Sequence, residues 1–430
     1  MKKLLIVNIL AAACLALATA GGAQDFSQYP NPEFAKMIAG NPALACNTAC
    51  PYELALQNGP DTKAPKGYKP FYISHYGRHG SRSGWDRERY DRVISELSKA
   101  KEAGILAAAG DSLLQETMAA KQATNNMDGR LTVRGQREHR EIAGRMYERF
   151  PEVFRGSDKN IRVLTSTVPR CIVSMAAFTN RLCSMNSRLS IVMDCGSEIQ
   201  KELSNDESQA ADKRRNEISA VLRKTINPDL SGMMGRLFSD PEAAKQFIPD
   251  TKEFSRDIYA IGQTSRSFDI DLNVHRFLPF DALYGWADYL NMRLYLGQCN
   301  SVELGEERME RTKPLVQLIL RQADDALASG EIAADLRFGH DLPLIALCCY
   351  LGVEGIGERY TGEEARRHFI SAFYCPFAGN LQIVFYQSRK AGDPILVKVL
   401  MNEREVKLIG LEPVQGPYYR WADLREKISC

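Results

Sequence analysis

Three segments of the chain have a short apolar run that stops abruptly and is followed by apolar positions at helical spacing. They are residues 71–84 (FYISHYGRHGSRSG), after which the helical pattern begins, residues 161–178 (IRVLTSTVPRCIVSMAAF) and residues 336–352 (LRFGHDLPLIALCCYLG). Each pattern predicts a buried strand, a turn and a helix. Ligands bind at such strand-to-helix turns in α/β sheets. We therefore expect an α/β sheet with a functional site where these strands end.

Helical periodicity continues directly after the first of these segments. Residues 85–101 carry apolar side chains at helical spacing with charged residues elsewhere, which predicts an amphipathic helix. We interpret its arginines, Arg87, Arg89 and Arg92, as a solvent-facing side. The alternative is that one of them contacts a polyanionic substrate.

Residues 129–151 predict a second amphipathic helix, with Thr132 as its N-cap. His139 falls on the charged side of this helix, so we expect an exposed histidine. Pro169 suits the first turn of the helix in the second strand-to-helix segment. His275 precedes an aromatic-rich helical stretch, and we interpret it as structural.

Strand patterns are absent from residues 197–330, return at Asp335 and continue through residues 375–410. We expect residues 24–196 and 331–430 to form one α/β sandwich core with a mostly parallel sheet. Residues 197–330 are then an inserted α-helical cap over the carboxyl edge of that sheet.

The composition is that of a soluble globular protein, with 430 residues, 44% hydrophobic and 25% charged. The formal net charge of +2 argues against nucleic-acid binding, for which a strongly basic face is typical. No segment beyond the N-terminal stretch has the roughly 20 unbroken apolar residues of a membrane span. We therefore expect a protein that binds small molecules, does not bind nucleic acid and has no transmembrane segment. We favour a monomer, although the oligomeric state does not follow from the sequence.

Residues 1–23 combine two lysines, an apolar stretch and small residues that offer cleavage after Ala20 or Ala23. This pattern predicts a secretory signal peptide, and with it export to the periplasm, the cell surface or the medium. The alternative is a lipoprotein with its lipid on Cys14.

The cysteines are compatible with an exported protein. Of eleven cysteines, ten remain without Cys14, an even number suited to disulfides. Candidate pairs are Cys46 with Cys50 and Cys183 with Cys195, although the pairing does not follow from the sequence. Neither the cysteines nor the six histidines cluster at zinc-ligand spacing, so we expect no metal and no cofactor.

The first strand-to-helix segment places Arg78 and Arg82 around His79. Histidine can act as a covalent nucleophile, and arginines can hold the oxygens of an anion in a fixed fork. This suggests a phosphate ester substrate; the alternative is an ordinary loop histidine beside solvated arginines. Arg170 stands at the expected start of the second helix, where anions are favoured; the alternative is an arginine paired with a surface carboxylate.

His340 and Asp341 lie between the strand and the helix of the third segment. A carboxylic acid there could protonate a leaving alkoxide, provided that its pKa is raised. The alternative for an isolated His-Asp pair is a helix cap.

RHGSR after a strand resembles the RHGxRxP signature of the histidine acid phosphatases, the branch of the histidine phosphatase superfamily that includes phytases. Gly84 stands where the signature has proline. The Leu-Thr-x-x-Gly of residues 131–135, the surroundings of Arg170 and the His-Asp pair of residues 340–341 resemble later motifs of this family, in the same order. PFAxNL and VxVLxNE elements in residues 376–403 are similar to multiple inositol polyphosphate phosphatases, although these typically have His-Ala-Glu where this chain has His-Asp.

This resemblance spans about residues 70–412 and implies a role for each residue. His79 is the nucleophile, and Asp341 protonates the leaving group and later activates water. Phosphate is bound by Arg78, Arg82 and Arg170 together with His340. The implied substrates are inositol polyphosphates; a broad-specificity acid phosphatase is the nearest alternative, and a non-catalytic phospholigand-binding protein is the alternative from another class.

Overall fold

The computed structural model describes residues 25–56, 59–156, 159–203 and 209–429. The expected signal peptide and the alternative lipid site at Cys14 lie outside the described residues. Among the described helices, none is long and apolar enough to cross a lipid bilayer.

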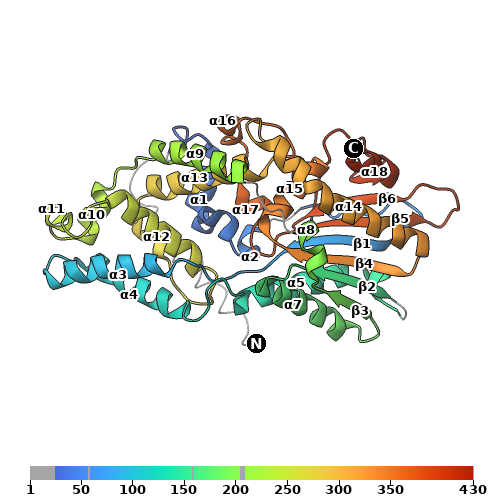
Figure 1. The fold of residues 1–430 in the computed structure, drawn as a ribbon, viewed down its shortest axis with the longest axis horizontal. Helices are drawn as coiled ribbons and strands as arrows, with labels where there is room; N and C mark the ends of the chain where they lie inside the picture. Colours follow the sequence, from blue (N-terminus) through green and yellow to red (C-terminus); the bar gives the residue numbers. More distant parts are fainter. Residues whose placement is uncertain (1–24, 57–58, 157–158, 204–208, 430) are drawn as a thin grey trace, which may run out of the picture.

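One β-sheet forms the centre of one half of the molecule (Figure 1). Its strands are β1 (Tyr68–Arg78), β2 (Asn160–Thr165), β3 (Ser190–Asp194), β4 (Ile332–Gly339), β5 (Asn380–Ser388), β6 (Leu396–Met401), β7 (Arg404–Glu405) and β8 (Tyr418–Arg420). They run in the order β3-β2-β4-β1-β5-β6-β7, with β8 also paired to β6. The first four in this order are parallel, and β5 to β8 extend the sheet with antiparallel pairs.

The register brings the carboxyl ends of β1, β2 and β4 to the same level. Phe338 of β4 lies opposite Gly77 of β1 on one side and opposite Thr165 of β2 on the other. The second half of β1 is fully buried because strands flank it and helices cover both faces, which explains why its sequence shows no polar alternation. The three strand-to-helix segments therefore end at one edge of the sheet.

Helices cover both faces of the sheet, which confirms the α/β fold class. On one face lie α5 (Val133–Arg149), α6 (Pro151–Phe154) and α7 (Pro169–Met185); on the other lie α14 (Gly305–Ser329), α15 (Asp341–Leu351) and α18 (Trp421–Ser429) (Figure 1). Thr132 caps α5 by accepting the Gly135 N–H, and Pro169 begins α7, both as expected. Gly330, at φ 67°, ends α14 in the left-handed conformation and returns the chain to β4.

The other half of the molecule is helical. It contains α1 (Pro32–Gly40), η1 (Pro42–Ala49), α3 (Arg87–Glu102), α4 (Ala108–Ala123), α9 (Gln209–Thr225), α10 (Ser231–Leu237), α11 (Pro241–Ala244), α12 (Thr251–Ser265), η3 (Val274–Phe277) and α13 (Phe280–Gln298). Short elements join the two halves: α2 (Tyr52–Ala55), η2 (Ser197–Ile199), α8 (Gln200–Leu203), α16 (Gly362–Ala365) and α17 (Ser371–Tyr374).

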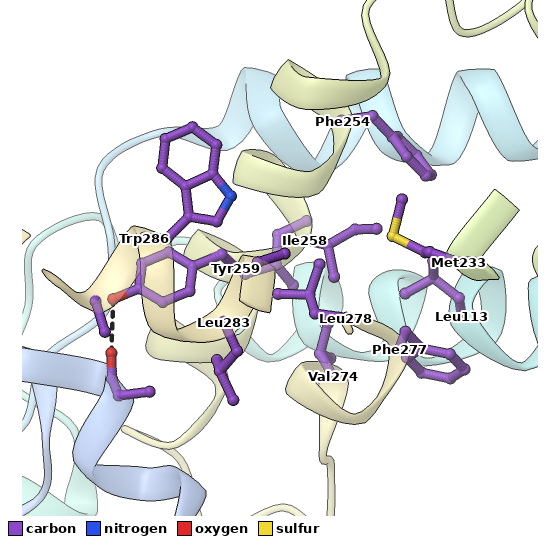
Figure 2. Close-up of a cluster of buried hydrophobic side chains, with 14 of the residues drawn as sticks. Leu113, Met233, Phe254, Ile258, Tyr259, Val274, Phe277, Leu278, Leu283 and Trp286 are labelled. Carbon is purple, nitrogen blue, oxygen red and sulfur yellow. Dashed lines mark hydrogen bonds between the residues drawn. The ribbon is translucent and has the colours of Figure 1, made fainter. Parts of the chain in front are cut away.

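This helical half has its own apolar core (Figure 2). Leu113 of α4 packs in one cluster with Met233 of α10 and Phe254 of α12. The cluster thus includes α1, α3 and α4, which precede residue 197 in the sequence. The division of the chain into a core and a cap at residues 197–330 stays a prediction.

Two expectations about side chains are wrong. His139 is only 1% exposed, because the N-terminal turns of α5 pack against the loop after β1, and its ring lies beside Phe178 and Phe338. The arginines of α3 do not form a purely solvated side, since Arg89 and Arg92 both bind the buried carboxylate of Asp257 on α12.

The cysteines differ from expectation as well. All cysteines within the described part of the chain are free thiols. Neither Cys46 with Cys50 nor Cys183 with Cys195 is joined. The disulfides suggested by the even number of cysteines therefore do not occur among the described residues.

Candidate active site

All the residues singled out in the three strand-to-helix segments meet at the carboxyl edge of the sheet. Arg78 is the last residue of β1 and His79 follows it, Arg170 is the second residue of α7, and His340 and Asp341 join β4 to α15. The backbone aligns the segments: the Arg78 N–H donates to Gly379, and the His79 N–H donates to the carbonyl of Gly339 at 2.9 Å.

The His79 side chain is 2% exposed. Its Nδ1 lies 2.9 Å from the carbonyl oxygen of Gly80. A carbonyl only accepts, so Nδ1 carries the proton and Nε2 keeps its lone pair. Burial, and then the guanidinium groups of Arg78, Arg170 and Arg82, hold the pKa of His79 well below 6.5. His79 is therefore a neutral imidazole with one nitrogen available as a nucleophile.

The Arg78 side chain is fixed from several sides. It forms an ion pair with Asp341 at 3.0 Å and donates to the carbonyls of Cys375, at 3.0 Å, and of Thr48. The ring of Phe377 lies below its guanidinium group, 4.6 Å from the centroid. The cation of Arg78 is thus held in place beside His79.

Arg82 and Arg170 make fewer contacts with the protein. Arg82 donates to the carbonyl of Ser83 at 2.8 Å, and Arg170 donates to Nδ1 of His340 at 3.2 Å. Burial, and then repulsion by the cations of Arg78 and Arg170, lowers the pKa of Arg82 to about 10 against the pull of Asp341. Both groups thus have N–H donors left for an anion.

His340 has a defined tautomer. Because arginine only donates, Nδ1 of His340 accepts from Arg170, so Nε2 donates to the Ser166 hydroxyl at 3.0 Å. Burial, and then Arg170, lowers the pKa of His340 to about 4. His340 is therefore neutral and orients Arg170.

Asp341 begins α15, where the helix dipole favours a negative charge. Burial raises its pKa, but the guanidinium groups of Arg78 and then Arg82 outweigh burial, and the pKa is lowered overall. The carboxyl is ionised in this environment. The protein groups around Asp341 therefore do not by themselves give it the raised pKa that a proton donor needs.

The loop after His79 is attached to α5 by contacts that the sequence did not reveal. Glu138 accepts from the N–H and the hydroxyl of Ser81, both at 2.7 Å, and from the Tyr52 N–H at 3.1 Å. Thr132 donates its hydroxyl to the Ser81 carbonyl at 3.0 Å. A Cβ on Gly80 would lie 2.4 Å from the carbonyl oxygen of Gly135, so the backbones touch directly. The Leu-Thr-x-x-Gly segment thus supports the nucleophile loop.

A cavity of about 280 Å³ lies beside this site, with Arg78, Arg82, Trp85, Asp341 and Phe377 in its wall. His79 and His340 lie behind this wall and are not part of it. His275 binds the Tyr259 carbonyl through Nε2 at 2.9 Å in the helical half, as expected for a structural residue. Among the described residues, no group of three or more His, Cys, Asp or Glu side chains could hold a metal ion.

Two further cavities adjoin this one on the side of the helical half. One, of about 620 Å³, shares Arg89 and Gln263 with the catalytic cavity; the other, of about 300 Å³, shares Thr48 and Asp341 with it. Cations dominate the wall of the larger cavity: Arg89, Arg223, Lys224, Lys252, Arg256 and Arg293, against Asp250 and Glu253.

Comparison with known proteins identifies the family and the fold of the chain. Residues 77–402 match the family described as "Histidine phosphatase superfamily (branch 2)". A multiple inositol polyphosphate phosphatase of Bifidobacterium longum, crystallised with phosphate, is similar in fold with a TM-score of 0.71 and 17% identity, over 90% of this chain and 97% of that one. The phytase from D. castellii has a TM-score of 0.71 and 14% identity, over 90% and 84% of the two chains.

Proposed function

Because the chain belongs to branch 2 of the histidine phosphatase superfamily and is a phosphatase of that family, we propose that it hydrolyses inositol polyphosphates through a phosphohistidine on His79. The observation that carries the proposal is the neutral imidazole of His79, with Nε2 available, between guanidinium groups and a carboxyl. Arginines and a nucleophile alone would also suit a binding protein, but Asp341 adds the group that a leaving alkoxide needs.

In the first step, the guanidinium groups of Arg78, Arg82 and Arg170 hold the oxygens of one phosphate group. Nε2 of His79 attacks phosphorus in line with the ester oxygen, the P–O bond breaks, and Asp341 gives a proton to the departing oxygen. The guanidinium groups neutralise charge on the transferring phosphoryl group. His340 takes part by holding Arg170.

In the second step, a water molecule attacks phosphorus of the phosphohistidine. The Asp341 carboxylate accepts the proton of that water, and the N–P bond breaks with its electrons returning to Nε2 of His79. Inorganic phosphate leaves, and Asp341 is again protonated for the next cycle.

The lowered pKa of Asp341 fits this cycle once a substrate is considered. Arg78 and Arg82 lower that pKa, and a phosphate dianion bound to the same guanidinium groups offsets their field. Substrate binding therefore raises the pKa of Asp341 and favours the protonated form that acts as the acid. The burial of the carboxyl, which already raises the pKa, acts in the same direction.

The adjoining cationic cavities support a substrate with several phosphate groups. Arg293 of α13 lies in the wall of both and has no carboxylate partner among the described residues. An inositol polyphosphate placed with one phosphate at His79 extends its others toward this surface. A small monoester occupies only the catalytic cavity.

Phosphate release from inositol hexakisphosphate, lower inositol phosphates and p-nitrophenyl phosphate tests the substrate class. We expect a higher kcat/KM for inositol hexakisphosphate, and a drop of about tenfold for that substrate alone in Arg293→Ala, from one lost charged contact. Arg425→Ala, at an exposed pair with Asp324 far from the site, is the control. Equal kcat/KM values for all monoesters, unaffected by Arg293→Ala, would favour a broad-specificity acid phosphatase instead.

Export and domain organisation belong to the same proposal. Residues 1–23 have the pattern of a signal peptide, and residues 197–330 are proposed as the cap insertion. N-terminal sequencing of the mature protein should begin after Ala20 or Ala23. A mature chain that starts at a lipidated Cys14 would replace this with membrane anchoring.

A further inference from the structure

Trp85 stands at the mouth of the catalytic cavity with an unusually open side chain. It is 58% exposed, whereas Trp286 and Trp421 are 1% and 5% exposed. The guanidinium carbons of Arg82 and Arg170 lie 5.6 Å and 5.5 Å from its ring centroid. Both distances are within the range of a cation–π contact. One indole thus holds two of the arginines that face the nucleophile.

A guanidinium group held by an aromatic ring differs from one held by a carboxylate, because it keeps its hydrogen-bond donors. A carboxylate partner occupies N–H donors and neutralises the charge, as Asp341 does for Arg78. An aromatic ring contacts the flat face of the guanidinium group. The N–H donors point outward in the guanidinium plane and stay available, and the positive charge is not neutralised. The side chains of Arg82 and Arg170 each make one hydrogen bond within the described part of the chain. They are therefore oriented by Trp85 and still able to bind an oxyanion.

The position of the indole is itself fixed by the backbone around Gly129. A Cβ at Gly129 would lie 2.0 Å from the Trp85 ring, and Gly129 has φ +61°, which a side chain disfavours. The Gly129 N–H donates to the carbonyl of Gly84 at 3.2 Å. Arg87 ties this turn to α3 through Asp128 at 2.7 Å. The turn has room for the indole only because residue 129 carries no Cβ.

We propose that Trp85 is a positioning residue that holds Arg82 and Arg170 at the phosphate site while leaving their N–H donors free. The proposal rests on the proposed function in so far as these arginines bind the phosphate group. It predicts that the indole contributes to phosphate binding whatever the alcohol of the ester.

Binding of inorganic phosphate, measured by isothermal titration calorimetry, tests this most directly. Each exposed cation–π contact contributes a factor of roughly two to five, so Trp85→Leu should bind phosphate about tenfold more weakly. Trp85→Phe keeps a ring and should recover part of that loss. Gly129→Ala, which displaces the indole, should weaken phosphate binding in the same direction as Trp85→Leu. Trp421→Phe, in the sheet half, is the control and should bind like the wild type.

A second measurement uses the indole as a reporter. Phosphate that draws Arg82 and Arg170 toward itself changes the surroundings of Trp85, so wild-type tryptophan emission should change on titration. The change should vanish in Trp85→Leu, although Trp286 and Trp421 remain.

The outcomes separate the possible roles of Trp85. Normal phosphate affinity in Trp85→Leu would overturn the inference. If phosphate affinity stayed normal and only the KM for inositol hexakisphosphate rose, Trp85 would contact the cyclitol instead of positioning the arginines. A wild-type protein that neither binds phosphate nor hydrolyses monoesters would contradict the proposed function, whereas an active wild type with an unaffected Trp85→Leu would contradict this inference alone.

Discussion

Glu138 is a buried carboxyl that fixes the loop behind the nucleophile, and Glu138→Gln tests how it does so. It is 3% exposed and accepts hydrogen bonds from Ser81 and Tyr52. Burial raises its pKa from 4.5 to about 7, even though these donors lower it. Glutamine has a similar size, retains one acceptor oxygen and does not titrate. The substitution therefore removes the proton equilibrium and part of the hydrogen bonding, but little volume.

The sign of the pH effect follows from the raised pKa. Between about pH 4.5 and about pH 7 the folded protein binds more of the Glu138 proton than the unfolded chain does, so the free energy of unfolding falls as pH rises through this window. A shift of this size corresponds to about 3 kcal/mol. Relative to wild type, Glu138→Gln loses about 1–3 kcal/mol through imperfect hydrogen bonding. The variant should thus be clearly less stable near pH 4.5 and close to wild type above pH 7.

Urea unfolding, followed by tryptophan fluorescence at several pH values between about 4.5 and 8, measures the difference between the two proteins. Groups other than Glu138 contribute equally to both and cancel. Glu148→Gln, on the exposed side of the same helix, should follow wild type at every pH. A wild-type minus Glu138→Gln difference that is constant across this range would refute the reasoning, because Glu138 would then have an ordinary pKa in the folded protein.

Two further predictions concern the chemistry. Asp341→Asn should lower kcat/KM strongly for inositol phosphates, whose alkoxide needs a proton, and spare much of kcat/KM for p-nitrophenyl phosphate, whose phenolate leaves unaided. The kcat for p-nitrophenyl phosphate should still fall, because hydrolysis of the phosphohistidine lacks its carboxylate. Equal loss of kcat/KM on both substrates, with a lowered melting temperature, would make Asp341 structural. Arg170→Ala should lower kcat/KM by about 10² or more, as expected for a group that stabilises a transferring phosphoryl group, and Arg170→Lys should recover it only in part because a point charge does not replace the fork. A near-wild-type kcat/KM in Arg170→Ala would instead return Arg170 to a surface-pair role.

The sequence predicted the three strand-to-helix segments because each encodes its own geometry locally. An apolar run followed by glycine or proline ends a strand, and Pro169 starts the next helix in the second segment. Parallel strands place these turns at one edge, so Arg78, His79 and Arg170 could be expected together. The α/β fold class follows from the same pattern.

Residues whose role depends on tertiary contacts were not found from the sequence. Glu138 and His139 occur in a highly charged stretch, and only the packing of α5 on the nucleophile loop buries them. One signal could have suggested that Glu138 faces this loop. Glu138 follows Gly135 at helical spacing, and the backbone of Gly135 touches Gly80. Trp85 looked like the start of a helix, since nothing local shows that Arg82 and the distant Arg170 lie over its ring.

The ionisation of Asp341 shows a further limit of sequence reasoning. A carboxyl next to a histidine suggests a proton donor with a raised pKa. Whether burial or the two guanidinium groups has the larger effect depends on their positions in the fold. In this structure the guanidinium groups have the larger effect, and the pKa of Asp341 is lowered. Likewise, an even number of cysteines suits disulfides, yet the described cysteines are free thiols.

The central claim is that His79 carries the phosphoryl group, and acid-stopped mixing with ³²P-labelled substrate tests it most directly. Phosphohistidine is labile in acid, so the quench is neutralised at once and the label is mapped by mass spectrometry under alkaline conditions. We expect the phosphoryl group on His79 in wild type, more of it in Asp341→Asn because the carboxylate that activates water is missing, and none in His79→Ala. Label on His340 or His139, or full activity in His79→Ala, would contradict the account.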